Sequence, residues 1–396
     1  MRVLMLSSRI PFPLTAGFRI RIYNEAKRFH SIGAKVDLLY LGSQEDYYNY
    51  KAALSDVFNK VIVVPTNKLE ITWNIISALF TKEPFQVAIY KNKKYAEILN
   101  HIEKQYDLII GNHIRTAEYL KTLDENKIII DLHDAISYNY SNLIKNEVGL
   151  RRLIYKTEYK RVLQYEIKIC EIFKRIVIVS EKDKQWLSNK GADTSKITVI
   201  PVAVRDDITD FKSSYFDDQD VVCFLGKMSY QPNEDAVIWF AHKVMPKLEQ
   251  KYPNIVFCIL GIEPTESVKK LASDDSHVRV TGFVENPYSI MARAKATVVP
   301  IRNGAGVQNK LLESMLVGTP VVASQIAAEG ISAVDNLQIM IAKDEYEFFE
   351  KICKLFDSSE ERRRIGQAGQ EYIKNGFTWD SLWSKWYNIA FEGNMI

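Results

Sequence analysis

The sequence contains few cysteines and no closely spaced cysteine pair. Its four cysteines lie far apart along the chain, at positions 170, 223, 258 and 353. Zinc sites and dithiol redox sites commonly use cysteines within about two to four residues of one another, and no such pair occurs here. We expect four buried thiols that pack as small apolar side chains in a reducing compartment.

A long apolar run is also lacking. The N-terminal MRVLMLSS reaches Pro11 and Pro13 without the small-residue cleavage site of a signal peptide. No stretch approaches the ~18 consecutive apolar residues that suggest a membrane span. We therefore expect the protein to stay in the cytoplasm.

There is no strong excess of either charge. The chain has 52 Lys and Arg residues against 49 Asp and Glu residues, a formal net charge of +3. Proteins that bind nucleic acid normally carry a strong basic excess or a basic stripe. Nucleic acid is therefore not an expected partner.

Short apolar runs alternate with amphipathic stretches throughout the chain, a pattern typical of parallel sheets covered by helices. The expected strands of a first half are Arg2–Leu6, Lys35–Leu41, Val61–Val64, Asp107–Ile110, Ile128–Ile130 and Ile176–Val179. Those of a second half are Val221–Leu225, Ile255–Leu260, Val278–Val280, Thr297–Val299, Pro320–Ala323 and Leu337–Ile341.

The two series are separated by an irregular stretch, residues 200–216, which we interpret as a linker. A length of 396 residues also favours two domains over one. We predict an α/β protein of two doubly wound, Rossmann-like domains. The first covers residues 1–204 and also includes an aromatic C-terminal helix at 377–396. The second covers residues 205–376.

The most informative segment is PIRNGAGVQNKLLESMLVGTPVVAS, residues 300–324. It follows an expected strand, passes through glycines, begins a helix near Val307 and ends that helix at Gly318. Glycines before a helix let backbone N–H groups approach an anion, and the helix dipole adds positive potential. Lys310 and Glu313 share one helix face, where a cation suits a diphosphate and a carboxylate suits ribose hydroxyls.

This segment resembles the donor-binding signature of glycosyltransferase family 4, which are retaining enzymes of the GT-B fold. The wording GVQNK-LE is similar to a branch of exopolysaccharide sugar transferases. Glu313 matches the second of the family's two glutamates, which holds the donor ribose, whereas Ala305 stands where the first is usual. The resemblance implies that Gly304, Ala305, Gly306 and Val307 form the donor loop.

A second resemblance lies in VVCFLGKMSYQPNEDAVIWFA, residues 221–241. Relatives place two cations after the glycine to hold the leaving diphosphate. Gly226 and Lys227 match the first part, but Asn233 replaces the second cation, so Arg302 and Lys310 are expected to supply the missing charge.

The nucleobase is expected at the turn in VRVTGFVENPYSIMARAKATVVP, residues 278–300. The resemblance implies that backbone groups of Phe283 and Val284 face the base. Gly261 follows the strand VFCIL and should border the same crevice, at the carboxyl ends of the strands.

In the first domain, SSRIPFPLTAGFRIRIYN resembles the loop that faces the donor phosphates and the acceptor. Gly17 is the residue that carries this resemblance. Arg19 and Arg21 follow it at the start of a helix, where they could attract an anionic acceptor or form a solvated helix end.

Histidines follow two neighbouring strands of that domain. His133 ends the strand in IIIDLHDAISYN, where the resemblance implies contact with a donor-sugar hydroxyl. Asp134 could orient the imidazole or cap the next helix. His113 ends the preceding strand and is a candidate for the same edge.

Two further stretches could serve the acceptor side. Residues 145–175 hold nine Lys and Arg against four Glu at helical apolar spacing, which fits either a solvated helix or contact with an anionic membrane. ITWNIISALF, residues 71–80, places Ile71, Ile75, Ile76, Leu79 and Phe80 on one expected face, either as core or as an apolar lip.

Together the resemblance implies a retaining transferase that moves a sugar from a UDP- or GDP-sugar to a glycan acceptor. A lipid-linked glycan is the expected acceptor. Both domains would face a central cleft, with His133, Lys227, Lys310 and Glu313 at the reacting groups and no metal or other cofactor. A catalytically silent nucleotide-sugar-binding subunit and a nucleotide-sugar epimerase remain alternatives.

Overall fold

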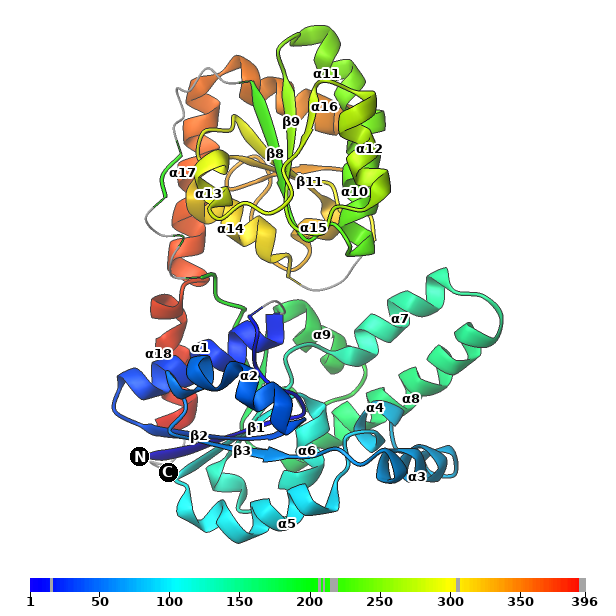
Figure 1. The fold of residues 1–396 in the computed structure, drawn as a ribbon, viewed down its shortest axis with the longest axis vertical. Coiled ribbons are helices and arrows are strands. Elements are labelled where there is room, and N and C mark those ends of the chain that lie inside the picture. Colours follow the sequence, from blue (N-terminus) through cyan, green and yellow to red (C-terminus); the bar gives the residue numbers. More distant parts are fainter. Residues whose placement is uncertain (15–16, 206–207, 209–210, 214–219, 304–306, 392–396) are drawn as a thin grey trace. The chain divides into compact units, whose positions relative to one another are not determined.

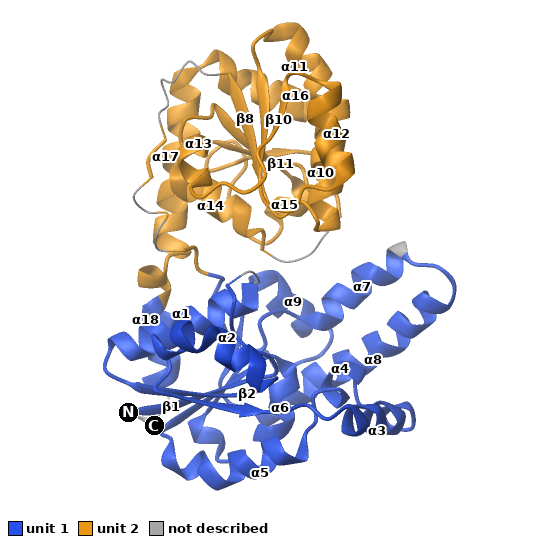
Figure 2. Ribbon diagram, in the orientation of Figure 1, with its two compact units in different colours: residues 1–202, 383–396 blue, residues 203–382 orange. Residues whose placement is uncertain are grey.

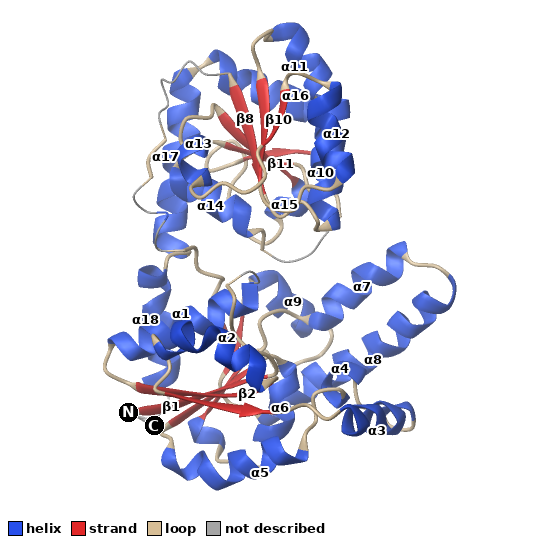
Figure 3. Cartoon of the chain, in the orientation of Figure 1, coloured by secondary structure: helices blue, strands red, loops and turns tan. Residues whose placement is uncertain are grey.

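The structure is a computed structural model that describes residues 1–396 except 15–16, 206–207, 209–210, 214–219, 304–306 and 392–396. The chain divides into two compact units (Figure 2). Unit 1 contains residues 1–202 and 383–396, and unit 2 contains residues 203–382. Each unit is a parallel sheet covered by helices, as Figure 3 shows.

The sheet of unit 1 has seven strands in the order β3-β2-β1-β4-β5-β6-β7. Its inner strands β4 and β5 are mainly apolar and buried along their whole length because helices cover both faces of the sheet. The strands are β1 Arg2–Ser7, β2 Lys35–Leu41, β3 Lys60–Val64, β4 Leu108–Asn112, β5 Ile128–Asp131, β6 Ile176–Ile178 and β7 Ile197–Val199.

The helices of unit 1 include a long antiparallel pair, α7 and α8, that projects from the sheet (Figure 1). They are α1 Gly17–Ser31, α2 Gln44–Ser55, α3 Lys68–Leu79, α4 Phe85–Ala88, α5 Lys93–Ile102, α6 Ile114–Leu120, α7 Ile136–Asn146, α8 Gly149–Ile172 and α9 Glu181–Asn189, with 3-10 turns at Glu103–Gln105 and Glu125–Lys127.

The sheet of unit 2 has six strands in the order β10-β9-β8-β11-β12-β13. These are β8 Val221–Leu225, β9 Val256–Leu260, β10 Val278–Val280, β11 Ala296–Val299, β12 Val321–Ser324 and β13 Met340–Ala342. The helices are α10 Gln231–Lys243, α11 Met245–Lys251, α12 Glu266–Asp274, α13 Pro287–Met291, α14 Asn309–Val317, α15 Gln325–Ala328, α16 Glu345–Asp357 and α17 Ser359–Gly376, followed by α18 Trp379–Phe391.

Both sheets reverse their strand order at one point. In unit 1 the chain builds outward from β1 on one side and from β4 on the other, and in unit 2 the same happens at β8 and β11. In open α/β sheets, ligands bind outside the carboxyl ends of the strands at such a point. These two edges are therefore where functional side chains are expected.

The C-terminal helix packs with its aromatic residues against helix α1 of unit 1. Trp383 and Trp386 lie edge-on to the ring of Phe29, at centroid distances of 5.1 and 6.3 Å. Trp379 is buried as well. Tyr387 does not share this face, since it is exposed and its ring contacts only Phe391 among the described aromatic pairs.

The predicted strands all occur, and the structure adds β7, which the sequence analysis missed. The four cysteines are buried free thiols, as expected from their spacing. Among the described residues, no helix is long and apolar enough to cross a bilayer.

Candidate functional site

Four adjacent strand ends in unit 2 carry most of the predicted donor residues. Gly226 follows β8, Gly261 follows β9 and Phe283 lies just beyond β10, while the loop after β11 leads into α14. The sheet thus gathers segments that are distant in sequence at the carboxyl edge beside its switch point (Figure 1).

The loops after β8 and β9 approach each other so closely that the second of them needs glycine. A Cβ on Gly261 would lie 1.6 Å from the carbonyl oxygen of Gly226, and its φ of +154° is itself unfavourable for other residues. A Cβ on Gly226 would lie 2.7 Å from the Asn233 side-chain nitrogen. Because neither glycine has a side chain, backbone atoms of the two loops lie at this edge of the sheet.

Helix α14 begins at Asn309 without a side-chain cap and without an acidic residue in its first turn. Its first N–H groups and its dipole are therefore available to an anion. The helix ends at Gly318, whose left-handed φ of 87° matches the predicted C-cap. Gly304, Ala305 and Gly306, the centre of the predicted donor loop, lie outside the described residues.

Lys310 lies in the first turn of α14 and is half-buried. Its Nζ donates to Oε1 of Gln308 at 2.9 Å and lies over the ring of Phe224. Burial lowers the pKa of Lys310 to about 8, against a smaller opposing effect of Glu313. Glu313 is half-buried on the same helix. Val307, which precedes the helix, is partly buried and lies against Gly330.

The other two predicted cations are more exposed. Nζ of Lys227 pairs with Glu263 at 2.8 Å, with both side chains about half exposed, so this pair contributes little to stability and can open to a ligand. The exposed Arg302 lies over the ring of Trp239, 5.6 Å from its centroid.

Asn233, which stands where relatives have the second cation, has a structural role here. It is buried, and its Nδ2 donates to the carbonyl oxygen of Lys227 at 2.9 Å. Its amide therefore holds the loop that carries Lys227. Beyond β10, Phe283 is exposed, and Val284 packs partly against the core.

In unit 1 the predicted residues follow β1, β4 and β5, which are neighbours in the sheet. Gly17 is the first residue of α1, is exposed, and leaves open space where a Cβ would stand. Arg19 is half-buried, donates to the carbonyl oxygen of Pro13 at 3.3 Å and lies over the ring of Phe18.

His113 and His133 are brought together as a stacked pair. Their ring centroids are 4.1 Å apart and their planes differ by 13°. Both residues have a φ of 65°, which is uncommon outside glycine. It turns the backbone sharply after each of the two strands. Nδ1 of His113 and Nε2 of His133 are buried and have no hydrogen-bond partner among the described residues.

Both imidazoles are held neutral. Burial lowers the pKa of His113 well below its usual value, with further lowering by His133 and Arg115. Burial also lowers the pKa of His133 well below its usual value, with Arg21 and Arg115 adding to the effect. A neutral imidazole can donate through one nitrogen and accept through the other, which suits sugar hydroxyls.

Beneath His133 lies a buried cluster of Arg21, Glu25 and Asp131. Nε of Arg21 is 2.5 Å from Asp131 and 3.0 Å from Glu25. Its Nη1 donates to the carbonyl oxygens of Ile200 and Pro201. The acceptor-side role predicted for Arg21 is therefore wrong, because the side chain is buried in these contacts and cannot reach a ligand.

Asp131 links this cluster to the histidine edge. Its Oδ1 accepts from the backbone N–H of His133 at 3.1 Å, and its Oδ2 lies 3.8 Å from Nε2 of that residue. Asp134 points to a different partner, since its Oδ2 accepts from Nδ2 of Asn139 at 2.6 Å. Burial raises the pKa of Asp134 to about 6, so the carboxylate form still prevails at pH 7.

Two arginines that the sequence analysis missed meet at Tyr90. The guanidinium of Arg9 lies 5.5 Å from the centroid of this ring and that of Arg115 lies 4.7 Å from it. Nε of Arg9 donates to the Tyr90 hydroxyl, whereas the buried Nε of Arg115 has no partner in the described part of the chain. Arg9 and Arg115 follow β1 and β4, so their positions after strands were the available signal.

One group in the described ranges has three side chains close enough to hold a metal ion, namely Glu249, Asp275 and His277. His277 directly precedes β10, at the amino end of that strand. This group therefore lies at the opposite edge of the unit 2 sheet from the predicted donor residues.

Part of the chain matches a known family. Residues 219–358 match the family described as Glycosyl transferases group 1, and this range includes the carboxyl edge of the unit 2 sheet. The chain is 24% identical over 392 residues to an uncharacterised 44.6 kDa protein of the cps region of Klebsiella pneumoniae, covering 95% of this chain and 96% of that one. It is 26% identical over 278 residues to an uncharacterised glycosyltransferase of Methanocaldococcus jannaschii, covering 65% and 69%.

Solved structures are similar over the whole chain. TarM of S. aureus has a TM-score of 0.70 at 14% identity and 98% coverage of both chains. Anabaena HepE in complex with UDP-glucose has a TM-score of 0.65 at 15% identity and 100% coverage of both. The fold is that of GT-B glycosyltransferases, and the matched domain supports a transferase.

Proposed function

We propose that the protein is a retaining glycosyltransferase of family 4, similar to its exopolysaccharide branch. It transfers a sugar from a UDP- or GDP-sugar to a lipid-linked glycan in the synthesis of a surface polysaccharide or glycoconjugate. The observation that carries the proposal is the edge of unit 2, where the uncapped start of α14 and Lys310 adjoin the close Gly226–Gly261 approach. A relative encoded in a cps region and a neighbour solved with UDP-glucose support it.

The donor is assigned to unit 2. Glu313 accepts hydrogen bonds from the ribose hydroxyls, and backbone groups at Phe283 and Val284 face the base. Lys227, Arg302 and Lys310 hold the diphosphate together with the N-terminus of α14. The Lys227–Glu263 pair opens to admit the phosphates, which is inexpensive because both side chains are half exposed.

Charge develops on the diphosphate as the bond to the sugar breaks, so fixed cations stabilise the transition state. The acceptor hydroxyl attacks from the face that the diphosphate leaves, and a phosphate oxygen takes its proton. His133 holds a donor-sugar hydroxyl as a neutral imidazole, positioned by Asp131 through its backbone. We propose that this chemistry requires no metal.

The acceptor is assigned to unit 1 and to the cations near its histidine pair. Arg9 and Arg115 both point to the Tyr90 ring, and no carboxylate forms an ion pair with either within the described residues. Two guanidinium groups without a counterion favour an anion. We infer that they hold the phosphate of a lipid-linked acceptor.

The test is a transfer assay with UDP- and GDP-sugars and a lipid-linked acceptor, with the anomeric configuration of the product read by NMR. We expect nucleotide release that depends on acceptor, a retained configuration, and loss of transfer in Glu313→Ala. Binding without consumption would favour a silent subunit, conversion of the donor without acceptor would favour an epimerase, and an inverted product would contradict the mechanism.

The acceptor assignment is tested separately by Arg115→Gln. We expect a rise of about tenfold or more in KM for a phosphate-bearing acceptor, as for loss of a charge-assisted contact, with little change for a neutral sugar acceptor. An equal effect on both acceptors would indicate a purely structural role for Arg115.

A further inference from the structure

Helix α3 presents an apolar stripe to solvent. Leu69, Trp73 and Phe80 are 82%, 72% and 86% exposed, and Ile76 is exposed between them. Positions 69, 73, 76 and 80 fall on one helix face because they are three or four residues apart. The opposite face packs on unit 1 through Ala78, so the stripe is not part of the core.

This arrangement corrects the sequence interpretation of residues 71–80. Ile71 and Ile75 are half-buried, whereas Ile76, Leu79 and Phe80 are exposed. The five residues therefore do not form one face. The exposed side instead includes Leu69 and Trp73, which were not among the residues expected to form the apolar lip.

A second exposed apolar surface lies where α7 meets α8. Leu143 near the end of α7 is exposed, as are four residues at the start of α8, and Val148 and Leu150 reach 80% and 73%. The exposed apolar residues of this hairpin tip are Leu143, Val148, Leu150, Leu153 and Ile154.

Cations surround the hairpin tip. The exposed basic side chains from residue 143 to residue 160 are Lys145, Arg151, Arg152, Lys156 and Lys160. The same stretch contains two glutamates. One of them, Glu158, is buried and accepts from the backbone N–H groups of Phe85 and Gln86, so it does not offset the surface charge.

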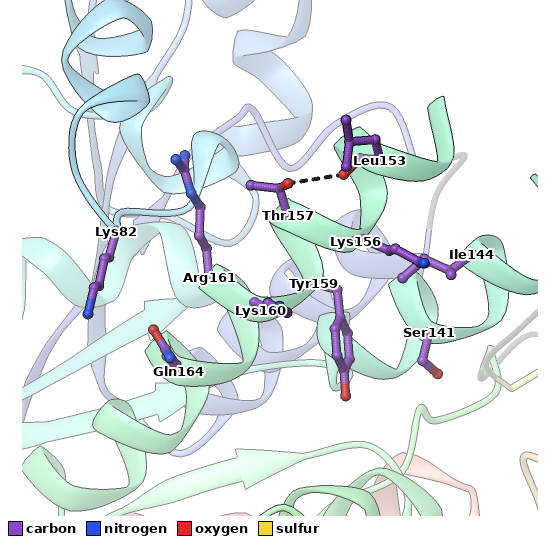
Figure 4. Close-up of a pocket in the computed structure, with 10 residues that line it drawn as sticks. All are labelled: Lys82, Ser141, Ile144, Leu153, Lys156, Thr157, Tyr159, Lys160, Arg161 and Gln164. Atoms are coloured by element: carbon purple, nitrogen blue, oxygen red, sulfur yellow. Dashed lines mark hydrogen bonds between the residues drawn. The ribbon is translucent and has the colours of Figure 1, made fainter. Parts of the chain in front are cut away.

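The α3 stripe and the hairpin tip belong to one side of unit 1, where both project beyond the sheet (Figure 1). Arg161 of α8 donates to the carbonyl oxygens of Ala78 and Glu83, which fixes α8 against the end of α3. A groove of about 860 Å³ lies along α7 and α8 (Figure 4), lined by Leu153, Lys156, Lys160 and Arg161 among others, with Lys82 from the segment that follows α3.

We propose that these two elements form a docking surface for the anionic face of a lipid bilayer. The apolar side chains of α3 and of the hairpin tip enter the headgroup boundary. Arg151, Arg152 and the neighbouring lysines meet acidic headgroups. An amphipathic helix with apolar residues on one side and Lys or Arg beside them is the pattern of a protein that lies on a membrane.

A protein partner fits this surface less well. Protein interfaces are depleted in lysine at their centres, whereas Lys82, Lys156 and Lys160 line the groove along α7 and α8. A bilayer requires no matching shape, so two separate apolar elements on one side can both insert. The proposal does not depend on the transferase activity, because lipid binding is measured without any sugar donor.

The test is co-sedimentation of the full chain with vesicles of equal parts phosphatidylglycerol and phosphatidylcholine, compared with vesicles of phosphatidylcholine alone. We expect binding to the anionic vesicles that weakens as salt is added. Arg151→Gln with Arg152→Gln should lower partitioning about fivefold for each cation removed. Trp73→Ser with Phe80→Ser should lower it roughly tenfold or more.

The matched control is Tyr48→Ser with Lys51→Gln on α2, which removes one exposed aromatic ring and one exposed cation from the same unit. It should bind as the unchanged protein does. Trp73→Phe gives a second readout: it should still bind but lose the blue shift of tryptophan emission that insertion of Trp73 produces.

Equal loss of binding in the α2 control would overturn the proposal, because attraction would then be unspecific. Absence of vesicle binding would overturn it as well. If the α3 and hairpin variants instead convert a dimer to a monomer in light scattering, the surface is an interface between two copies of the chain and not a membrane surface.

Discussion

The rings of His113 and His133 lie face to face, 4.1 Å apart between centroids. Two imidazolium ions cannot share this position, because like charges at short range disfavour protonation. Burial and the nearby arginines lower the pKa of both rings well below the usual value. The pair therefore presents neutral rings over the physiological pH range.

This neutrality can be tested by NMR titration of the histidine ring protons. The signals of His113 and His133 should stay constant as pH falls from about 8 to about 6, a range that includes the ordinary histidine pKa of about 6.5. His277 is the internal control. A bond to the carbonyl oxygen of Pro253 raises its pKa, so its signal should titrate in that range. Titration of His133 with His277 would contradict a neutral pair.

Donor affinity should fall in alkaline solution because of Lys310. Burial lowers the pKa of this amine to about 8, so its charge is present below that pH and is lost as pH rises through it. Nucleotide binding measured by calorimetry should weaken above about pH 8. Lys310→Arg should remove this dependence, since guanidinium keeps its proton. An unchanged pH profile in that variant would place the titrating group elsewhere.

The approach of Gly226 and Gly261 predicts that alanine is not tolerated at position 261. A Cβ there would meet a carbonyl oxygen at 1.6 Å, so the loops must separate. Gly261→Ala should lower the free energy of unfolding by about 3 kcal/mol or more, measured in urea. Gly17→Ala is the control, because its Cβ meets open space, and it should change stability by less than about 1 kcal/mol.

The cluster below His133 predicts a large loss of stability in Arg21→Met. Asp131 would then be buried without its cation, which typically costs about 3–5 kcal/mol, beside Glu25, whose pKa burial already raises well above its usual value. Lys27→Met is a matched control, since Lys27 is exposed on the same helix. Adding Asp131→Asn and Glu25→Gln should recover part of the loss in urea unfolding. No loss in Arg21→Met would show that the cluster is not an ion-paired unit.

The sheets could be predicted from the sequence because their inner strands are continuous apolar runs between helices. The strand Ile197–Val199 could not, since it is short, lies at the sheet edge and leaves two of its three residues half exposed. Its apolar signal is too weak to distinguish it from the adjoining linker.

The positions of His133 and Gly226 in the fold were predictable because each follows the end of an apolar strand. The position of Arg21 at the start of a helix was not enough to predict its role. Its side chain shares the buried face of α1 with Ile22, Glu25 and Phe29. Helical spacing alone places Arg21 and Glu25 four residues apart on that face. The meeting of Arg9 and Arg115 at Tyr90 depends on tertiary packing of α4, which no local pattern indicates.

The most direct measurement is calorimetric titration of the purified chain with UDP, GDP and ADP and their common sugars. We predict that one nucleotide binds selectively and that Glu313→Ala abolishes this binding while the chain remains folded by circular dichroism. If none of the nucleotides binds, or if Glu313→Ala binds as tightly as the unchanged protein, the donor site proposed at the start of α14 is contradicted.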